Sequence, residues 1–231
     1  MGNPSNRLMD DPLVKASGQG MLAAARAYMD EYAREIFDLW FGGRAPDEVV
    51  FDNPKWAAYM QADAGLGAQI DRHLTTFALK FRDDFFARSP GANPVVSHEP
   101  YRLTFHAEVG PPSGGFKTGY SQLHGSNQTV GDFQMQGTFS MAAAAESKLD
   151  FAFSNNQMTF NDKVDPNFRY KTDAVFANLA KNLAMATGGP PPKNYILRIR
   201  WREAGPWTYS IPAAPSKPGK PDWLRQFPNL P

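Results

Sequence analysis

Residues 160–171 read Phe-Asn-Asp-Lys-Val-Asp-Pro-Asn-Phe-Arg-Tyr-Lys and lie between a run of alternating strands and a late amphipathic helix. The stretch holds two carboxylates, Asp162 and Asp165, in an expected strand-to-helix turn. Carboxylates three positions apart on a turn can face one small volume, where they hold a divalent cation or share proton transfer. Asn, Asp and Pro also favour turns for conformational reasons alone. The pattern therefore predicts either the centre of this chain's chemistry or an ordinary turn.

The segment after the turn predicts one helix and then two strands. Apolar residues recur at helical spacing over 173–186, and Gly188-Gly189 with three following prolines ends that helix. Residues 195–202 then alternate apolar and polar side chains, which is typical of a half-buried strand. We expect the alternating residues 207–211 to pair with it across Gly205-Pro206.

The segment before the turn predicts further strands. Residues 101–106 and 130–141 alternate with a period of two. Within 149–160 we expect two strands joined by a hairpin turn at Asn155-Asn156. Residues 142–146 are short and lie between strands, so we expect a turn there as well.

The first ninety residues predict helices. An apolar stripe runs from Gly20 to Phe41, Asn53-Pro54 is a good cap and first turn for a short helix, and a second long stripe covers residues 70–85. The aromatic part of this stripe, residues 77–86, suits either a membrane-active face or a protein core. Mixed charges on its opposite face favour the core.

We therefore expect an α+β protein. A helical subdomain spans residues 1–92, and residues 93–231 form an antiparallel β-sheet or half-open barrel with one inserted helix, at 173–186. The tail is rich in Pro and Lys, and its aromatic residues predict that it docks on the sheet domain.

The composition excludes several classes of protein. With 24 basic and 23 acidic residues the net charge is +1, so no long-range field favours nucleic acid. The absence of cysteine excludes disulfides, thiolate nucleophiles and thiolate zinc sites. No stretch approaches the roughly 18 apolar residues that span a bilayer, and residues 1–7 lack the apolar segment of a signal peptide. We expect a protein without a transmembrane segment, made in the cytoplasm without a signal peptide.

Two other groups are candidates for chemistry. Arg198 and Arg200 lie on one face of the strand 195–202, where their guanidinium groups can bind phosphate or carboxylate, or form an ordinary solvated face. His124 lies on a polar loop and can act as an acid or base, although loop histidines are usually just exposed. The spacing of the histidines gives little support to a zinc site.

Residues 118–201 resemble the activity domain of colicin M-type bacteriocins, enzymes that cleave the undecaprenyl-pyrophosphate link of the peptidoglycan precursor lipid II. That family carries an acidic turn, Asp-x-Tyr-Asp-Phe-Asn, then a His-Arg pair, a helix, a Gly and a Lys-x-Tyr-x-Ile strand. Here the turn reads Asp162-Lys163-Val164-Asp165-Pro166-Asn167 and the strand reads Lys193-Asn194-Tyr195-Ile196-Leu197. Val164 stands in place of the Tyr, and Lys171-Thr172 in place of the His-Arg pair.

The resemblance implies catalytic and metal-binding roles for Asp162 and Asp165, with a divalent cation such as Mg²⁺ or Ca²⁺. The essential histidine of the family has no counterpart, so Arg169, Lys171 and His124 are the candidates for the basic partner. Asn167, Arg198 and Arg200 are the candidates for binding the anionic, lipid-linked substrate.

The leading hypothesis is an antibacterial toxin similar to colicin M that hydrolyses lipid II after export to a target-cell periplasm, with an immunity or secretion protein as a partner. A non-enzymatic binding or secretion-associated protein that keeps the β fold is the first alternative. A toxin that perturbs membranes through its helical half is the second.

Overall fold

The computed structural model describes residues 12–28, 31–109, 129–145, 147–164 and 181–213. It confirms an α+β fold, with helices and a mixed six-stranded sheet that does not close into a barrel. The chain forms two compact units, each assembled from separate segments. Unit 1 comprises Met1–Gln69, Thr104–Met135 and Gln157–Arg202; unit 2 comprises Ile70–Leu103, Gln136–Asn156 and Glu203–Pro231. The expected division into 1–92 and 93–231 as independent domains stays a prediction.

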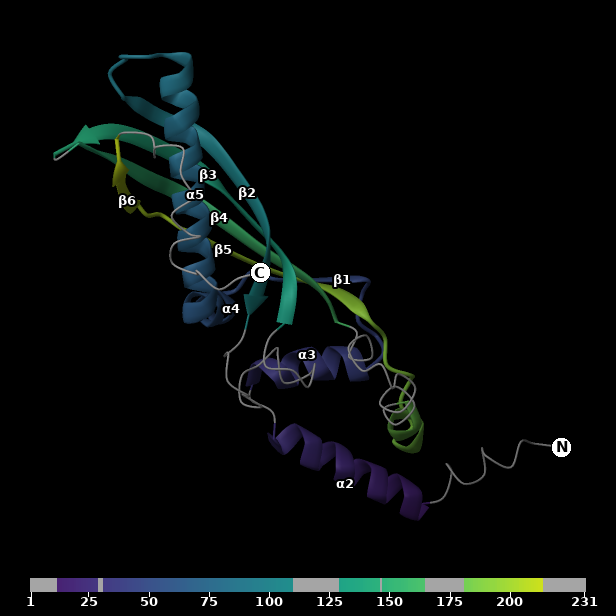
Figure 1. Ribbon diagram of the computed structural model, residues 1–231. Helices are drawn as coiled ribbons and strands as arrows, with labels where there is room; N and C mark the ends of the chain where they lie inside the picture. Colours follow the sequence, from purple (N-terminus) through teal and green to yellow (C-terminus); the bar gives the residue numbers. More distant parts are fainter. Residues whose placement is uncertain (1–11, 29–30, 110–128, 146, 165–180, 214–231) are drawn as a thin grey trace, which may run out of the picture. The chain divides into compact units, whose positions relative to one another are not determined.

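The helices of unit 1 begin with α2 (Pro12–Tyr28) and α3 (Glu31–Phe41), where the sequence predicted one helix from Gly20 to Phe41 (Figure 1). Next comes α4 (Pro54–Gln61), which starts where the sequence predicted. The side chain of Asn53 accepts a hydrogen bond from the backbone N of Trp56 at 3.1 Å, which satisfies a helix N–H group that has no partner within the helix.

Aromatic side chains and one carboxylate join the helices of unit 1. Trp56 is fully buried and stacks on Phe51 of β1 (Glu48–Phe51), with ring centroids 4.7 Å apart. Glu35 Oε2 of α3 accepts hydrogen bonds from Trp56 Nε1 and from Lys55 Nζ, both at 3.0 Å. The buried indole N–H therefore has a partner, as a buried donor requires.

The strands follow the order β1-β5-β4-β3-β2. Their bounds are β2 Val96–Val109, β3 Thr129–Ala144, β4 Lys148–Val164 and β5 Tyr195–Glu203. The strand β1 pairs with β5 in parallel, with Glu48 opposite Ile196. A short strand from the N-terminal segment thus joins a sheet that the sequence predicted to be antiparallel throughout.

One face of β5 is buried and the other carries polar groups. Tyr195, Leu197, Ile199 and Trp201 are buried, and Tyr195 Oη donates to the carbonyl of Ile36 in α3 at 3.2 Å. Burial and the nearby Glu35 raise the pKa of Tyr195, so its hydroxyl stays protonated as a donor. The alternation predicted for residues 195–202 is confirmed.

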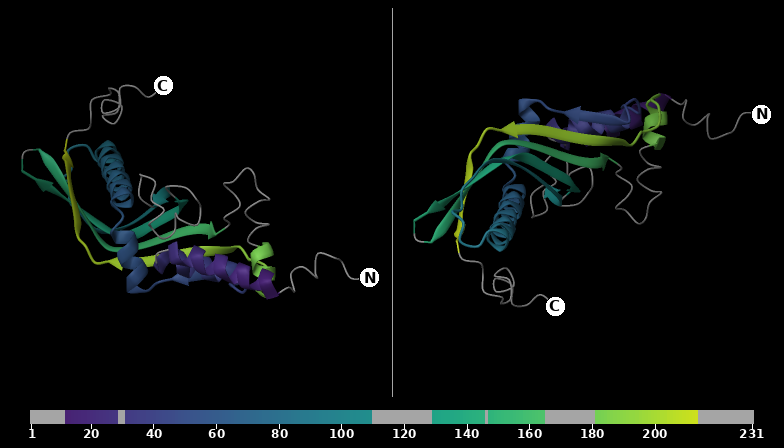
Figure 2. Two further views of the ribbon diagram at one scale, coloured as in Figure 1. Left: turned by 90° about the horizontal axis from the view of Figure 1, so that it is seen from below. Right: turned by 90° about the horizontal axis from the view of Figure 1, so that it is seen from above.

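The helix α5 (Ala64–Arg88) belongs to unit 2 from Ile70 onward. This part of the helix lies along one face of the strand segments of unit 2 (Figures 1 and 2). Phe77 and Phe81 on this helix meet Phe139 of β3 edge to face, with ring centroids 5.1 and 4.7 Å apart. Phe81 also contacts Phe151 of β4. These residues of the predicted aromatic stripe therefore form a core, which confirms the preferred interpretation.

The strand β4 runs without interruption through the predicted hairpin, so that prediction is wrong. Asn155 adopts a φ of 55°, which inserts one extra residue into the strand as a bulge. Before the bulge Phe151 and Phe153 are buried, and after it Met158 and Phe160 are. Asn and Asp tolerate this left-handed conformation in bulges as well as in turns, which is why the sequence signal was misleading.

The last strand, β6 (Trp207–Pro212), pairs with β4 in antiparallel fashion and not with β5 as expected. Leu149 lies opposite Ile211, and Phe153 opposite Trp207. The backbone N of Asn155 donates to Ala204 O at 3.0 Å, so the connection after β5 keeps following β4. The chain therefore does not reverse at Gly205-Pro206.

Candidate functional site

A row of polar side chains crosses the sheet of unit 1, with one member on each strand. We call this set the polar row; it consists of Glu48 on β1, Arg198 on β5, Asn161 on β4, Asp132 on β3 and His106 on β2. Its side chains are half-buried or exposed, whereas Leu197, Ile199 and Phe133, next to them in the chain, are buried. The polar row therefore lies on the solvent side of the strands.

Arg198 occupies the middle of the polar row. Its Nε donates to Asn161 Oδ1 at 2.7 Å, and its Nη1 lies 3.1 Å from Glu48 Oε1. The side chain of Arg198 is 31% exposed. Part of the guanidinium is thus engaged by two neighbouring strands, and the rest reaches the surface.

The other half of the polar row continues from Asn161 to His106. Asn161 Nδ2 donates to the backbone carbonyl of Asp132 at 3.4 Å. The carboxylate of Asp132 lies 2.9 Å from His106 Nδ1. Hydrogen-bonding groups on β5, β4, β3 and β2 are therefore connected in sequence.

The position of Asp132 follows from close packing around it. A Cβ on the preceding residue, Gly131, would come within 2.5 Å of the ring of Phe160 and of the carbonyl of Asn161. Only glycine allows β3 and β4 to approach so closely here. On the following residue, the ring of Phe133 lies 4.8 Å from that of Phe105 on β2.

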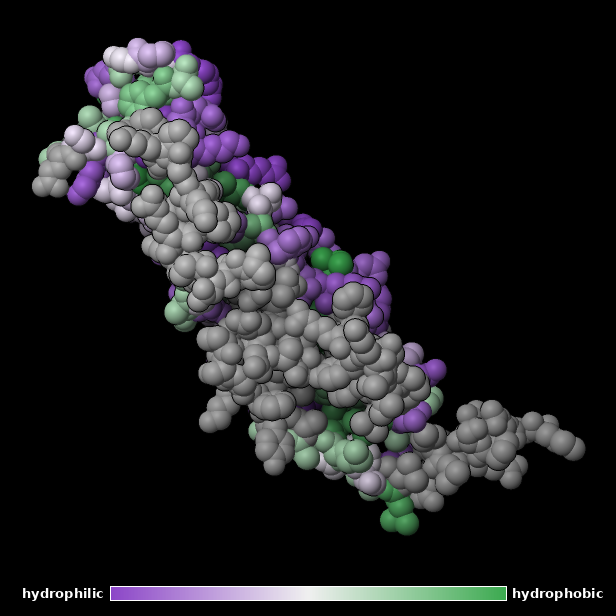
Figure 3. All heavy atoms as spheres, in the orientation of Figure 1, coloured by the Kyte–Doolittle hydropathy of each residue, from purple (hydrophilic) through white to green (hydrophobic). Residues whose placement is uncertain are grey.

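A cavity of about 360 Å³ borders the His106–Asp132 pair. It is lined by Thr104, Phe105, His106, Asp132, Phe133 and Gln134. This volume falls within the usual range for small-molecule sites, and polar residues of β2 and β3 are part of its lining. Hydrophilic residues also gather over β2 on the face drawn in Figure 3.

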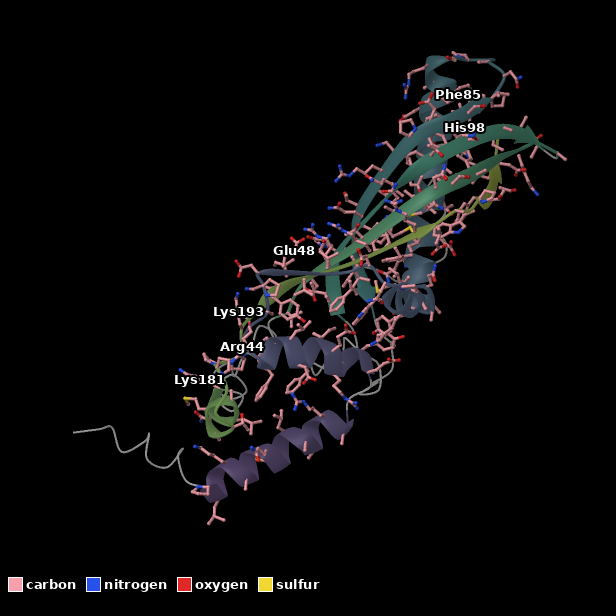
Figure 4. The ribbon with its side chains drawn as sticks, turned by 180° about the vertical axis from the view of Figure 1, so that it is seen from behind. Arg44, Glu48, Phe85, His98, Lys181 and Lys193 are labelled. Atoms are coloured by element: carbon pink, nitrogen blue, oxygen red, sulfur yellow. The ribbon has the colours of Figure 1, made fainter. Side chains whose placement is uncertain are left out.

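At the edge of the sheet, basic and acidic groups anchor the start of β5. Lys193 Nζ lies 2.9 Å from Asp47 Oδ1 and donates to Ala45 O at 2.9 Å. The indole N–H of Trp40 donates to Asn194 Oδ1 at 3.0 Å. Figure 4 shows Glu48 and Lys193 following one another along this edge.

The structure describes three of the site residues named from the sequence. Asp162 is half-buried near the end of β4, and its Oδ1 accepts a hydrogen bond from the backbone N of Lys163 at 2.7 Å. Arg198 belongs to the polar row, and Arg200 is exposed two residues further along β5. The other named residues lie outside the described part of the chain; they are Asp165, Asn167, Arg169, Lys171 and His124.

His106 and Asp132 were not singled out as a pair from the sequence. Each residue lies at a polar position of an alternating strand, and this alternation was the one sequence feature that could have indicated an exposed site there. Their meeting depends on how β2 and β3 align.

Within the described ranges, no group of three or more His, Asp or Glu side chains could hold a metal ion. In the same ranges, no helix has the length and apolar character needed to cross a membrane, which agrees with the expected lack of a transmembrane segment. Comparisons of the chain with protein-family models, with curated proteins and with solved structures found no match. The site is therefore interpreted from its own chemistry.

Proposed function

We propose that this protein is an antibacterial hydrolase that cleaves a lipid-linked pyrophosphate precursor of the cell wall, lipid II, in the manner of the colicin M-type bacteriocins it resembles. The order of elements supports the proposal. β4 carries Asp162 and ends at Val164, residues 181–186 are helical, Gly188 follows, and β5 begins at Tyr195. β4 and β5 are neighbours in the sheet.

One observation carries the proposal furthest: Arg198 Nε donates to Asn161 Oδ1 at 2.7 Å. Asn161 immediately precedes Asp162, so a guanidinium group contacts the strand that carries Asp162. Hydrolysis of the phosphoric ester bond that joins the lipid to the pyrophosphate depends on positive charge that stabilises the phosphate oxygens in the transition state. Arg198 supplies such a charge, and exposed Arg200 adds a second on the same strand.

In the proposed reaction Asp162 and Asp165 would hold a divalent cation, Mg²⁺ or Ca²⁺. Such a cation neutralises the phosphate oxygens when it is bound. Asn167 and the two arginines orient the anionic group, and Arg169, Lys171 and His124 are the candidates that the sequence offers for the basic partner. The protein acts in the periplasm of the target cell, and an immunity or secretion protein is its expected partner.

The test is hydrolysis of purified lipid II in detergent micelles with Mg²⁺ or Ca²⁺, followed by chromatography of the products. We expect the wild-type protein to release the lipid alcohol, and Asp162→Asn and Asp165→Asn to lower the rate at least about 100-fold. Asp150→Asn is the matched control, because Asp150 lies on β4 in unit 2, where it accepts a hydrogen bond from Ser210. Equal rates in wild type and both turn variants would contradict the assigned roles.

A non-enzymatic binding function is the second candidate. The hydrogen bond from Lys163 N to Asp162 Oδ1 favours it, because a carboxylate that accepts from its own backbone can serve the turn alone. The two functions are separated by expressing each variant in the bacterial periplasm. Growth arrest that persists in Asp162→Asn and Asp165→Asn supports binding, whereas its loss supports hydrolysis.

A further inference from the structure

The pairing of His106 with Asp132 contributes little to the stability of the fold. The two side chains are 81% and 68% exposed. Water screens ion pairs at such positions, so they stabilise folded proteins only weakly. The pair does, however, fix the orientation of the imidazole.

Asp132 determines which nitrogen of His106 carries the proton in the neutral ring. Asp132 Oδ1 lies 2.9 Å from Nδ1, and a carboxylate accepts a hydrogen bond from that nitrogen. The lone pair of the neutral imidazole is then on Nε2. The carboxylate of Asp132 is the ion-pair partner of His106 among the described residues.

The partner of the imidazole is itself held in place. The backbone carbonyl of Asp132 accepts from Asn161 on β4, and neighbouring Gly131 packs against Phe160. A general base is effective when its orientation is fixed before the substrate binds. The packing of β3 on β4 thus fixes the strand position from which Asp132 reaches the imidazole.

The imidazole borders a cavity of about 360 Å³ that can hold a ligand, because His106 and Asp132 are both in the lining of this cavity. Thr104 and Gln134, the polar neighbours of His106 and Asp132 two positions away on the same strands, also line it and supply hydrogen-bonding groups. A substrate group bound there lies next to an oriented base.

We propose that His106 is the proton-transfer group of this site and that Asp132 is its positioning residue. The inference rests on the proposed hydrolysis of the phosphoric ester bond between lipid and pyrophosphate. A water molecule forms a bond from its oxygen to phosphorus and gives one proton to Nε2 of His106. The bond from phosphorus to the leaving oxygen breaks, and the imidazolium returns that proton to the leaving oxygen.

The experiment compares His106→Gln, His106→Ala, Asp132→Ala and wild type in the lipid II assay, with bis(p-nitrophenyl) phosphate as a second substrate. Asp38→Asn is the control, because it removes another exposed ion pair in the same unit, Arg26–Asp38 at 2.7 Å. Nitrogen NMR on the His106 side chain reports which ring nitrogen carries the proton.

We expect both His106 variants to lower kcat about 100-fold or more with little change in KM, and free imidazole to restore part of the rate in His106→Ala. Asp132→Ala should lower kcat about tenfold or more and abolish the preference for a proton on Nδ1. Asp38→Asn should match wild type.

A wild-type rate in His106→Gln, with the Asp162 and Asp165 variants inactive, would overturn this inference and leave the proposed function intact. If wild type cleaves no lipid II, the proposed function is overturned, and the second substrate decides the inference. Loss of diester hydrolysis in His106→Gln then supports it. Equal rates in variant and wild type, including no hydrolysis by either, overturn it.

Discussion

Arg82 donates a hydrogen bond from Nη1 to the carbonyl oxygen of Pro212 at 2.8 Å, although the two residues lie on α5 and at the end of β6. The side chain of Arg82 is 1% exposed. Its Nη2 lies 2.7 Å from Asp83 Oδ1. The buried charge in unit 2 is thus compensated by a carboxylate and a carbonyl, as burial of a charge requires.

Replacement of this arginine should destabilise the protein. We expect Arg82→Met to lower the free energy of unfolding by about 2–3 kcal/mol, because Pro212 loses its donor and the carboxylate of Asp83 loses its partner. Urea denaturation measures the change. The control is Arg88→Met, which removes an exposed arginine whose Nε donates to Asp84 O in its own helix, and which should change stability by less than about 0.5 kcal/mol.

Gly131→Ala should be destabilising for steric reasons. The added Cβ comes within 2.5 Å of the Phe160 ring and of a backbone carbonyl, so β3 and β4 must separate. We expect a loss of about 1–3 kcal/mol in urea denaturation. A neutral effect would show that the two strands are not packed as closely as described.

Gly67→Ala is the opposite case. Gly67 lies in α5, is exposed, and has nothing within 4 Å of an added Cβ. Alanine is a better helix former than glycine, so we expect a gain of up to about 1 kcal/mol in the free energy of unfolding. Thermal denaturation should show a higher Tm, and a lower Tm would contradict the helix at this position.

The cap of α4 offers a fourth test of stability. We expect Asn53→Ala to cost about 1 kcal/mol, because Trp56 N loses its acceptor. Asn53→Asp should retain most of the stability, since a carboxylate accepts the same bond. Equal losses in the two variants would mean that the side-chain oxygen is not what stabilises this helix start.

His73 makes a contribution to stability that depends on pH. Burial lowers the pKa of His73 below its ordinary 6.5, and the charge of Arg72 lowers it further. The unfolded chain therefore binds this proton more readily, and stability decreases as pH falls from about 6.5 toward the lowered value. We expect His73→Gln to flatten the dependence of unfolding free energy on pH between about 5 and 7. Urea denaturation across this interval checks it, and an unchanged slope would contradict it.

Local sequence signals predicted the elements better than their partners. The Asn53-Pro54 pair and the alternation over 195–202 depend on neighbouring residues, and both predictions are confirmed. The pairing of β1 with β5 joins distant segments through four residues, Glu48–Phe51, too few for a clear period. Likewise, Asn155 suits a hairpin and a bulge equally well. The two are distinguished by the buried positions, which are odd-numbered up to Phe153 and even-numbered from Met158 on.

The candidate site was predictable only in part. Asp162 was visible as half of an acidic pair, and Arg198 as part of an arginine row. The contact between His106 and Asp132 was not, since their sequence positions say nothing about the alignment of β2 with β3. An alternating sequence predicts which face of the sheet a side chain occupies. It does not predict which side chain of the adjacent strand lies beside it, and a site depends on that pairing.

Each unit draws on three separate stretches of the polypeptide, and α5, β2, β3, β4 and β5 contribute residues to both. No single cleavage of the backbone can release either unit whole. A fragment ending at residue 92 keeps β1 without its partner β5, and the complementary fragment lacks α5. Both fragments would expose apolar faces or open strand edges that invite aggregation. Any gene fusion, domain exchange or expression boundary must therefore spare the interior of this chain.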